Sequence, residues 1–259
     1  MALKGEWTRI GGDLPGFVAI PASPPPWPAL IVVHAIMGID THIEQLCARF
    51  AEEGYYAASP DIYATDPGFK QHAHEDVEIA AHMGADAAKQ KAKLAQYPPD
   101  QQTRIVNARE WLNARPGHTY INTVRGAYER LSSQPNIRAI GAIGFCMGGR
   151  LVGELSATGA ALAAGIIHYG SPPKLDLVPK IVTPLEGHYA STDTPITGKI
   201  PAFAEAMKAA GKEFSYHVYE ADHGFSLGNT RFREAAQLAM ARSRKFLAEK
   251  LRPLTAAAE

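Results

Sequence analysis

Short apolar runs alternate along the chain with amphipathic stretches, which is the pattern of strands alternating with helices. The first run, Ala29–His34, follows a proline-rich stretch and is apolar almost throughout, as expected of a strand buried on both faces of a parallel sheet. The helical spacing of apolar residues then predicts a helix from Thr41 to Glu53, with Thr41 as its N-cap and Gly54 at its end. A second strand is predicted over Tyr55–Asp61.

The same alternation continues to the end of the chain. Strands are expected over Ile137–Ile143, Ala163–Tyr169, Ile181–Glu186 and Phe214–Tyr219, and helices over Asn122–Leu131, Gly149–Thr158, Pro201–Ala210 and Thr230–Leu251. This order predicts one α/β domain over residues 1–259, a doubly wound, mostly parallel sheet flanked by helices. Residues 64–118 are polar and poorly patterned, with one helix expected near Gln102–Asn113, and we expect this segment to form an excursion that covers the substrate.

Composition narrows the classes of partner. The chain has 26 basic and 26 acidic side chains, which argues against binding to nucleic acid or to an anionic membrane surface. It has no apolar run long enough to cross a bilayer, and its N-terminus lacks the apolar region of a signal peptide. Two cysteines make a disulfide framework implausible. We therefore expect a cytoplasmic protein, monomeric or homodimeric, with a small-molecule substrate.

A glycine-rich turn marks the strongest candidate for chemistry. The expected strand ending at Ile143 runs into Gly144–Gly149, and a helix follows, as in a nucleophile elbow whose nucleophile is Cys146. The helix N-terminus favours the thiolate form of this cysteine, and the Met147 amide is placed to bind an oxyanion. The second oxyanion donor is expected near Ala35 and Ile36. By itself, however, such a turn is equally compatible with a tight connection or a phosphate cradle.

Two later residues favour the catalytic interpretation. An elbow hydrolase presents its acid after a later strand and its histidine after the last strand. Asp193 follows the expected strand Ile181–Glu186, and His223 follows the expected strand Phe214–Tyr219. In this hypothesis His223 accepts the thiol proton and returns it to the leaving alcohol, while Asp193 holds the imidazole in its working tautomer and orientation.

Other candidates have competing structural interpretations. Cys47 lies on the apolar stripe of the first predicted helix and is interpreted as core. Asp222 adjoins His223 and so is expected to point elsewhere, while His34 is equally compatible with a pocket wall and with a packed, hydrogen-bonded histidine. Glu186 and His188 are near the acid loop, where they could support the catalytic residues, but a plain surface role fits them at least as well. A further three histidines are expected to be solvated rather than metal-binding: His72, His74 and His82.

At these residues the chain resembles the dienelactone hydrolases, or carboxymethylenebutenolidases, of the α/β-hydrolase superfamily. The resemblance covers nearly the whole chain and is carried by Ile31–Gly38, Gly54–Tyr63, Gly144–Gly149, Asp193 and Tyr219–Phe225. It implies a Cys-His-Asp triad at Cys146, His223 and Asp193, with the backbone N–H groups of Ile36 and Met147 as the oxyanion hole. It also implies hydrolysis of an enol-lactone without a metal or an organic cofactor.

The chain departs from this family at two pocket positions. Ala35 stands where the family commonly has a glutamate that pairs with the resting thiol, so Cys146 is expected to depend on His223 and the helix N-terminus. Leu227, which follows Phe225 in the expected pocket, stands where the resemblance implies an arginine that binds the substrate's carboxylate. Arg231 lies four residues further on, and is either a replacement or a residue of a helix surface. Leucine cannot make the bidentate contact that an arginine makes with a carboxylate. The two departures therefore argue against a dienelactone as the substrate.

Three functions are therefore compared. The first is hydrolysis of a small ester or lactone through a thioester on Cys146. The second keeps the fold and changes the chemistry to thiol-dependent acyl transfer, or to carbon–halogen hydrolysis, for which an aspartate is the usual elbow nucleophile. The third is a non-catalytic binding or redox-sensing protein in which Cys146 is reversibly oxidised.

Overall fold

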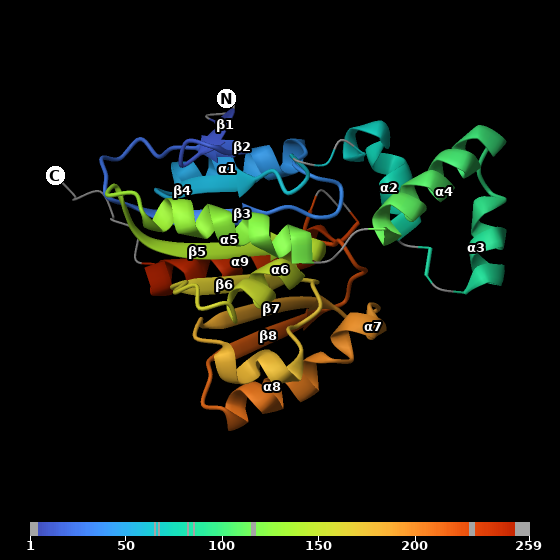
Figure 1. Ribbon diagram of the computed structural model, residues 1–259. Helices are drawn as coiled ribbons and strands as arrows, with labels where there is room; N and C mark the ends of the chain where they lie inside the picture. The colour runs from blue at the N-terminus through green and yellow to red at the C-terminus, as the bar shows by residue number, and fades with distance from the viewer. Residues whose placement is uncertain are drawn as a thin grey trace.

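A mostly parallel sheet forms the centre of the molecule (Figure 1). The computed structural model describes residues 5–64, 66, 68–81, 83–84, 86–114, 118–227 and 231–251. Within these residues the strands are β1 (Glu6–Ile10), β2 (Leu14–Ala19), β3 (Trp27–Val33), β4 (Tyr56–Pro60), β5 (Ile137–Phe145), β6 (Ala164–His168), β7 (Leu185–Ala190) and β8 (Phe214–Tyr219). Their order across the sheet is β1-β2-β4-β3-β5-β6-β7-β8. Only the β1–β2 and β2–β4 pairs are antiparallel.

Helices cover both faces of this sheet (Figure 1). Around the sheet they are α1 (Thr41–Glu52), α5 (His118–Ser132), α6 (Met147–Leu155), α7 (Thr194–Thr197), α8 (Ile200–Ala209) and α9 (Arg233–Leu251). Apolar residues of α1 and α9 share one core with the sheet, and those of α5 and α6 share another on the opposite face. The α/β fold predicted from the sequence, a doubly wound sheet between helices, is confirmed. Within the described residues, no helix combines the length and apolar character needed to cross a bilayer.

The winding of the chain reverses beside β3. After β3 the chain moves to one side to form β4, and then returns to form β5 on the other side of β3. A crevice forms at such a switch point, outside the carboxyl ends of the strands, and it is the usual ligand site of an open α/β sheet. The segments that leave β3 and β5 carry Ile36 and Cys146.

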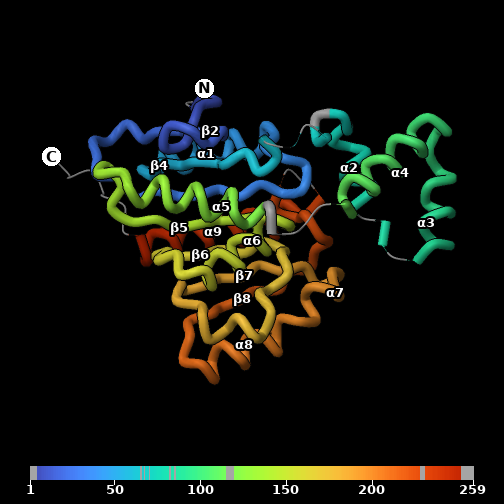
Figure 2. Tube along the Cα trace, viewed as in Figure 1, coloured from blue at the N-terminus to red at the C-terminus, as the bar shows by residue number. Residues whose placement is uncertain are grey.

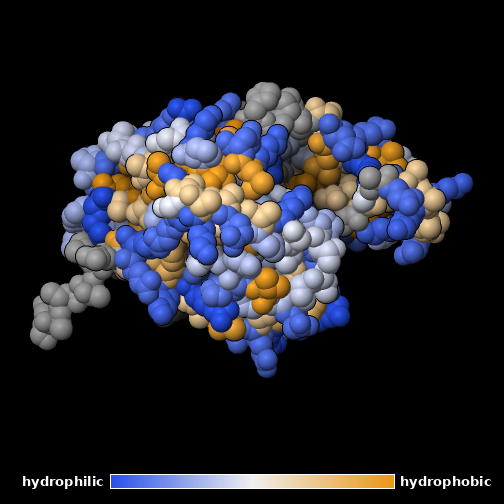
Figure 3. Space-filling view, turned by 90° about the horizontal axis from the view of Figure 1, so that it is seen from below, coloured by the Kyte–Doolittle hydropathy of each residue, from blue (hydrophilic) through white to orange (hydrophobic). Residues whose placement is uncertain are grey.

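A helical lobe stands beyond these strand ends, at the right of the tube view (Figure 2). It contains α2 (His74–Ala81), α3 (Ala87–Leu94) and α4 (Pro99–Asn113), preceded by the 3-10 turn η1 (Phe69–Gln71). Val77, Met83 and Ile105 belong to a small core of its own, against which Ile36 of the main body packs. Figure 3 shows apolar side chains on the lobe where it faces the rest of the molecule.

Several predicted elements need correction. The described residues of 64–118 include two helices beyond the one expected, α2 and α3. Helix α3 buries none of its described side chains and so has no apolar stripe to detect. The N-cap of α1 is Asp40, not Thr41: its Oδ1 accepts the Ile43 N–H at 3.0 Å. Strands β1 and β2 precede the first predicted strand and were not expected, since β1 is mostly exposed and β2 contains Pro15 and Gly16.

The prediction of a strand over Ile181–Glu186 was wrong by four residues at each end. Ile181 follows the 3-10 helix η2 (Leu175–Lys180) and belongs to a buried core cluster with Leu185 and Phe203. It is apolar because it packs in this core, not because it lies in a strand. The strand β7 begins after Pro184, which has no N–H to donate to a neighbouring strand. In consequence residue 188, expected after the strand, lies within it.

Candidate active site

Cys146 occupies a strained turn between β5 and α6. Its φ of 53° and ψ of −114° lie in a region that non-glycine residues rarely adopt. Glycines permit the turn: a Cβ added at Gly144 would lie 2.2 Å from the Gly148 carbonyl oxygen, and one at Gly148 would lie 2.2 Å from that of Val33. The Cys146 N–H donates to the carbonyl of His168 at 2.9 Å, which ties the turn to β6. The thiol is partly accessible to solvent.

His223 lies between Cys146 and Asp193. It belongs to the loop after β8, and Asp193 to the loop after β7, the two strands being neighbours in the sheet. The Nδ1 atom of His223 is 2.6 Å from Oδ2 of Asp193. Cys146 lies close enough to the ring to raise its pKa. Both partners of the 2.6 Å contact are largely buried, with side chains 22% and 12% exposed.

The charge of His223 follows from these contacts. Burial lowers the pKa of the imidazole, but the hydrogen bonds with Asp193 and Cys146, together with their charges, outweigh burial and raise the pKa to about 10. At neutral pH the imidazolium form therefore dominates.

Two backbone amides are candidates for an oxyanion hole. Met147 is the first residue of α6, where N–H groups have no partner within the helix. Ile36 follows β3, and Tyr63 connects the two positions: its hydroxyl donates to the Ile36 carbonyl at 3.0 Å and contacts Met147 Sδ at 3.7 Å. Sequence reasoning assigned no role to Tyr63, although its position three residues after β4, at the carboxyl edge of the sheet, is the available signal.

A cavity of about 380 Å³ adjoins His223. Its described lining includes Ala35 and Leu227, the two positions where the chain departs from the resemblance. Asp40 and Glu78 contribute carboxylates, Glu78 from the lobe, and no arginine is found among the lining residues that the structure describes. A second cavity, of about 430 Å³, lies beside Ile36 and Met147 and is lined in part by the lobe.

Other candidate residues lie in the core. His34 is fully buried, its Nδ1 2.7 Å from the Ala35 carbonyl and its Nε2 accepting the Ile62 N–H at 3.3 Å, and burial lowers its pKa. Phe225 is likewise fully buried, against Tyr169 and Tyr219, so neither side chain lines the His223 cavity.

Two expected surface residues are also buried. His188 is fully buried and Glu186 is 6% exposed, because both lie inside β7, four residues of which follow Glu186. Burial lowers the pKa of His188. Cys47 lies in the α1 core, as interpreted from the sequence, and burial raises the pKa of its thiol. A surface role for Glu186 and His188 is therefore corrected.

Arg231 lies away from the His223 cavity. It is exposed, stands before α9 rather than on it, and donates to Asp222 Oδ2 at 3.1 Å. Asp222 also accepts from the Thr192 hydroxyl at 2.8 Å, so its carboxylate turns from the imidazole of His223. Within the described residues no group of three histidine, cysteine or acidic side chains is arranged to hold a metal, and His82 lies outside those residues.

Comparison with known proteins shows the family of the chain. The family model described as "Dienelactone hydrolase family" matches residues 14–251. The chain belongs to the dienelactone hydrolase family. It is therefore a hydrolase by family, and its fold is that of the α/β-hydrolases.

The individual relatives and solved structures share less than 30% of their residues with this chain. A protein of Saccharolobus solfataricus named "Putative carboxymethylenebutenolidase" is 29% identical over 258 residues, covering 92% of this chain and 94% of its own. A Methylorubrum extorquens protein of the same name is 29% identical and covers 83% of this chain and 68% of its own. The crystal structure of a "Putative Dienelactone Hydrolase" from Klebsiella pneumoniae superposes with a TM-score of 0.70 at 24% identity, covering 95% of this chain and 98% of that one.

Proposed function

We propose that this member of the dienelactone hydrolase family cleaves small carboxylic esters or enol-lactones through Cys146. The observation that carries the proposal is the pairing of His223 with Asp193 at 2.6 Å, with Cys146 close enough to His223 to raise its pKa. The three residues come from three loops at the carboxyl edge of the sheet. The same three residues are those expected from the sequence as nucleophile, base and orienting acid. A nucleophile, a base beside it and a group that holds the base are the parts that acyl transfer requires.

In the proposed acylation step, the Cys146 proton resides on His223 and the sulfur attacks the substrate carbonyl carbon. The carbonyl oxygen becomes an oxyanion, which the amides of Ile36 and Met147 stabilise. When the intermediate collapses, the bond to the alkoxy oxygen breaks and His223 donates its proton to that oxygen. An ester releases its alcohol, whereas a lactone ring opens and keeps its hydroxyl on the acyl group.

Hydrolysis of the thioester completes the cycle. His223, now neutral, accepts a proton from a water molecule, whose oxygen attacks the thioester carbonyl in the same oxyanion hole. Collapse of this second intermediate breaks the carbon–sulfur bond, and the carboxylic acid leaves. Asp193 keeps His223 Nδ1 protonated through both steps, so that Nε2 exchanges the proton. Each of these steps uses groups of the chain itself.

The cavity beside His223 favours a small substrate whose part near this histidine carries no negative charge. Ala35 and Leu227 offer apolar surface, and the carboxylates of Asp40 and Glu78 repel an anion. The names of the similar proteins support lactones as one substrate class. We also propose that residues 64–118 cover the substrate, since Glu78 lines this cavity. A cytoplasmic location and a monomeric or homodimeric state remain predictions.

A panel of p-nitrophenyl esters and enol-lactones tests the proposal. We expect wild-type turnover to be abolished by iodoacetamide and by Cys146→Ala, and to persist in Cys47→Ala, the matched variant at the buried cysteine. A stoichiometric thioester at Cys146, seen by mass spectrometry after a brief reaction, is expected as well. Preferential transfer of the acyl group to an added amine indicates an acyltransferase instead. Reversible oxidation of Cys146 with no turnover of any acyl substrate indicates a redox sensor.

A further inference from the structure

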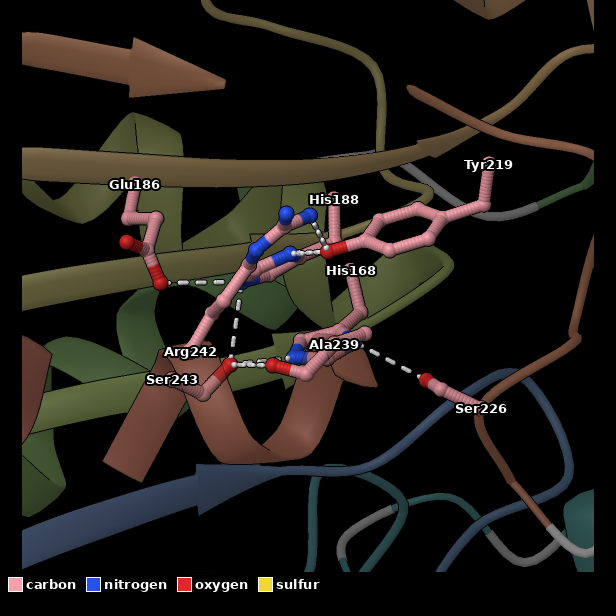
Figure 4. Close-up of polar contacts among 8 residues, drawn as sticks. All are labelled: His168, Glu186, His188, Tyr219, Ser226, Ala239, Arg242 and Ser243. Atoms are coloured by element: carbon pink, nitrogen blue, oxygen red, sulfur yellow. Dashed lines mark hydrogen bonds and ion pairs between the residues drawn. The ribbon is translucent and has the colours of Figure 1, made fainter. Parts of the chain in front are cut away.

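Behind the candidate active site, a network of polar side chains crosses the core between the sheet and α9 (Figure 4). It contains two fully buried histidines, His168 of β6 and His188 of β7, whose rings lie 4.6 Å apart. Neither has a part in the proposed chemistry. At one end of the network stands Ser226, three residues after His223 in the same loop. The network therefore reaches from the middle of the sheet to the loop that carries the proposed base.

The inner half of the network fixes His188. Its Nε2 is 2.9 Å from Glu186 Oε1, and a carboxylate only accepts, so we assign the proton to Nε2. Its Nδ1 then accepts from the Tyr219 hydroxyl at 2.9 Å, and Arg242 donates to the same tyrosine oxygen at 3.1 Å. Ser243 Oγ of α9 lies 3.0 Å from the same Nε2 atom, so contacts at both ring nitrogens hold the orientation of His188.

The hydrogen bonds of the outer half, around His168, can also be assigned a donor and an acceptor each. The Ser243 hydroxyl donates to the Ala239 carbonyl at 3.0 Å, so it accepts from His168 Nε2, also at 3.0 Å. With its proton on Nε2, His168 accepts at Nδ1, where Ser226 Oγ lies 2.9 Å away. Burial and the neighbouring His188 hold the pKa of His168 well below its ordinary value, so the ring is neutral and keeps this acceptor. The Ser226 hydroxyl is thus the donor to His168.

His168 also holds the nucleophile's turn. Its backbone carbonyl accepts the Cys146 N–H at 2.9 Å, and its ring packs on Phe145 with centroids 4.8 Å apart. The side chain and the backbone of one residue thereby contact the two loops that carry Cys146 and His223. Because the ring is held by Ser243 on α9, its Nδ1 presents a fixed point to the His223 loop.

We propose that His168, acting through Ser226, is a positioning residue that sets the distance between His223 and Cys146. The proposal rests on the proposed function, since it concerns the placement of the same base and nucleophile. Hydrolysis depends steeply on that placement, because a displacement of about 1 Å in a catalytic geometry can cost roughly a hundredfold in rate. The buried network beyond His168 keeps the ring in one tautomer and one orientation.

The test removes the hydroxyl of Ser226, a partly exposed residue. We expect Ser226→Ala to lower kcat for p-nitrophenyl acetate by about tenfold to a hundredfold with KM within roughly twofold. Ser226→Thr, which keeps a hydroxyl, is expected to recover most of the rate. Ser133→Ala removes a comparable hydroxyl, one that donates to the Arg130 carbonyl far from the site, and is the matched control.

A double-mutant cycle separates positioning from general damage. In a His223→Ala background the Ser226→Ala change is expected to cost less than about twofold, since the base that Ser226 positions is already absent. Wild-type kcat in Ser226→Ala, or an equal loss in both backgrounds, would overturn the positioning role while leaving the proposed function intact. Full activity in His223→Ala itself would overturn both.

Discussion

Strain and charge meet at Cys146 and His223. A non-glycine residue held at the φ and ψ of Cys146 costs about 1–3 kcal/mol, a cost that persists only where the surrounding structure enforces it. Here the close backbone approaches at Gly144 and Gly148 enforce it. The strained turn aims the sulfur at a histidine whose pKa is raised rather than lowered, although the ring is mostly buried. This combination is typical of a prepared nucleophile and base.

The raised pKa of His223 predicts how stability depends on pH. Folded His223 holds its proton up to pH about 10, whereas in the unfolded chain its pKa is 6.5. Its contribution to stability is therefore fully present below pH 6.5 and is lost as the pH rises through about 10. We expect the difference in unfolding free energy between wild type and His223→Gln, measured with urea, to shrink across this range. A difference that stays constant would contradict the assigned pKa.

Leu227 predicts substrate preference. Leu227→Arg places a guanidinium in a cavity whose described lining has no other, where a charge-assisted hydrogen bond contributes about 1.5–3 kcal/mol. We expect kcat/KM to rise at least about tenfold for esters that carry a carboxylate and to stay unchanged for neutral analogues. Leu227→Met, of similar length but uncharged, is the control. Equal gains with both substrate types would show that size, not charge, limits binding.

At the scale of elements, the helical lobe depends on one buried carboxylate. Asp76 of α2 is 2% exposed and accepts from Arg104 Nε of α4 at 2.8 Å. Arg104 also pairs with Asp100 at 2.8 Å, but that carboxylate is 74% exposed. The two pairs therefore share one cation and differ in burial, which makes them a matched comparison.

Removing the buried partner should loosen the lobe. We expect Asp76→Ala to cost about 1–3 kcal/mol of local stability, because Arg104 and Gln101 lose their buried acceptor. Asp100→Ala should cost less than about 1 kcal/mol. Hydrogen exchange is expected to speed up in α2 and α4 of Asp76→Ala while the sheet keeps its protection. A rise in KM would accompany it if the lobe covers the substrate. Equal exchange in both variants would contradict this account.

Some helices and strands could be predicted from the sequence and others could not. Strands buried on both faces, such as β3 and β5, were predictable because their apolar runs are continuous, and α1 because one stripe of it is buried. The lobe was not, since α3 buries nothing and its place in the fold depends on packing across residues 64–118. The strand predicted from Ile181 was misplaced because an apolar residue that packs in the core cannot be told from a strand residue by its apolar character alone.

At the scale of the whole molecule, the candidate site was more predictable than its support. Cys146, Asp193 and His223 follow strand ends in a fixed order, so chain order alone places them at one edge of the sheet. The residues of the network around His168 come from β7, β8, α9 and the His223 loop, and no local pattern connects residues so far apart in the chain. Their contacts arise only when the sheet and α9 pack.

That buried support predicts acid sensitivity of the entire fold. Burial lowers the pKa of His34, His168 and His188 below the 6.5 of an unfolded histidine. As the pH falls below 6.5 the unfolded chain takes up protons that the folded protein does not. Stability is therefore present above pH 6.5 and is lost on acidification, by about 1.4 kcal/mol per pH unit for each histidine that stays neutral.

Urea unfolding between pH about 7.5 and 5.5 measures this loss. Over this range the loss of unfolding free energy should be smaller by about 1.4 kcal/mol in total in His168→Gln, which removes one of these titrations. Ile143→Val, a core change without a titratable group, should lower stability by about 0.5–1.5 kcal/mol at every pH and leave the slope unchanged. Parallel curves for His168→Gln and wild type would mean that His168 is protonated in the folded protein. A charged ring has no acceptor to offer, so the same result would remove the hydrogen bond that Ser226 donates to it.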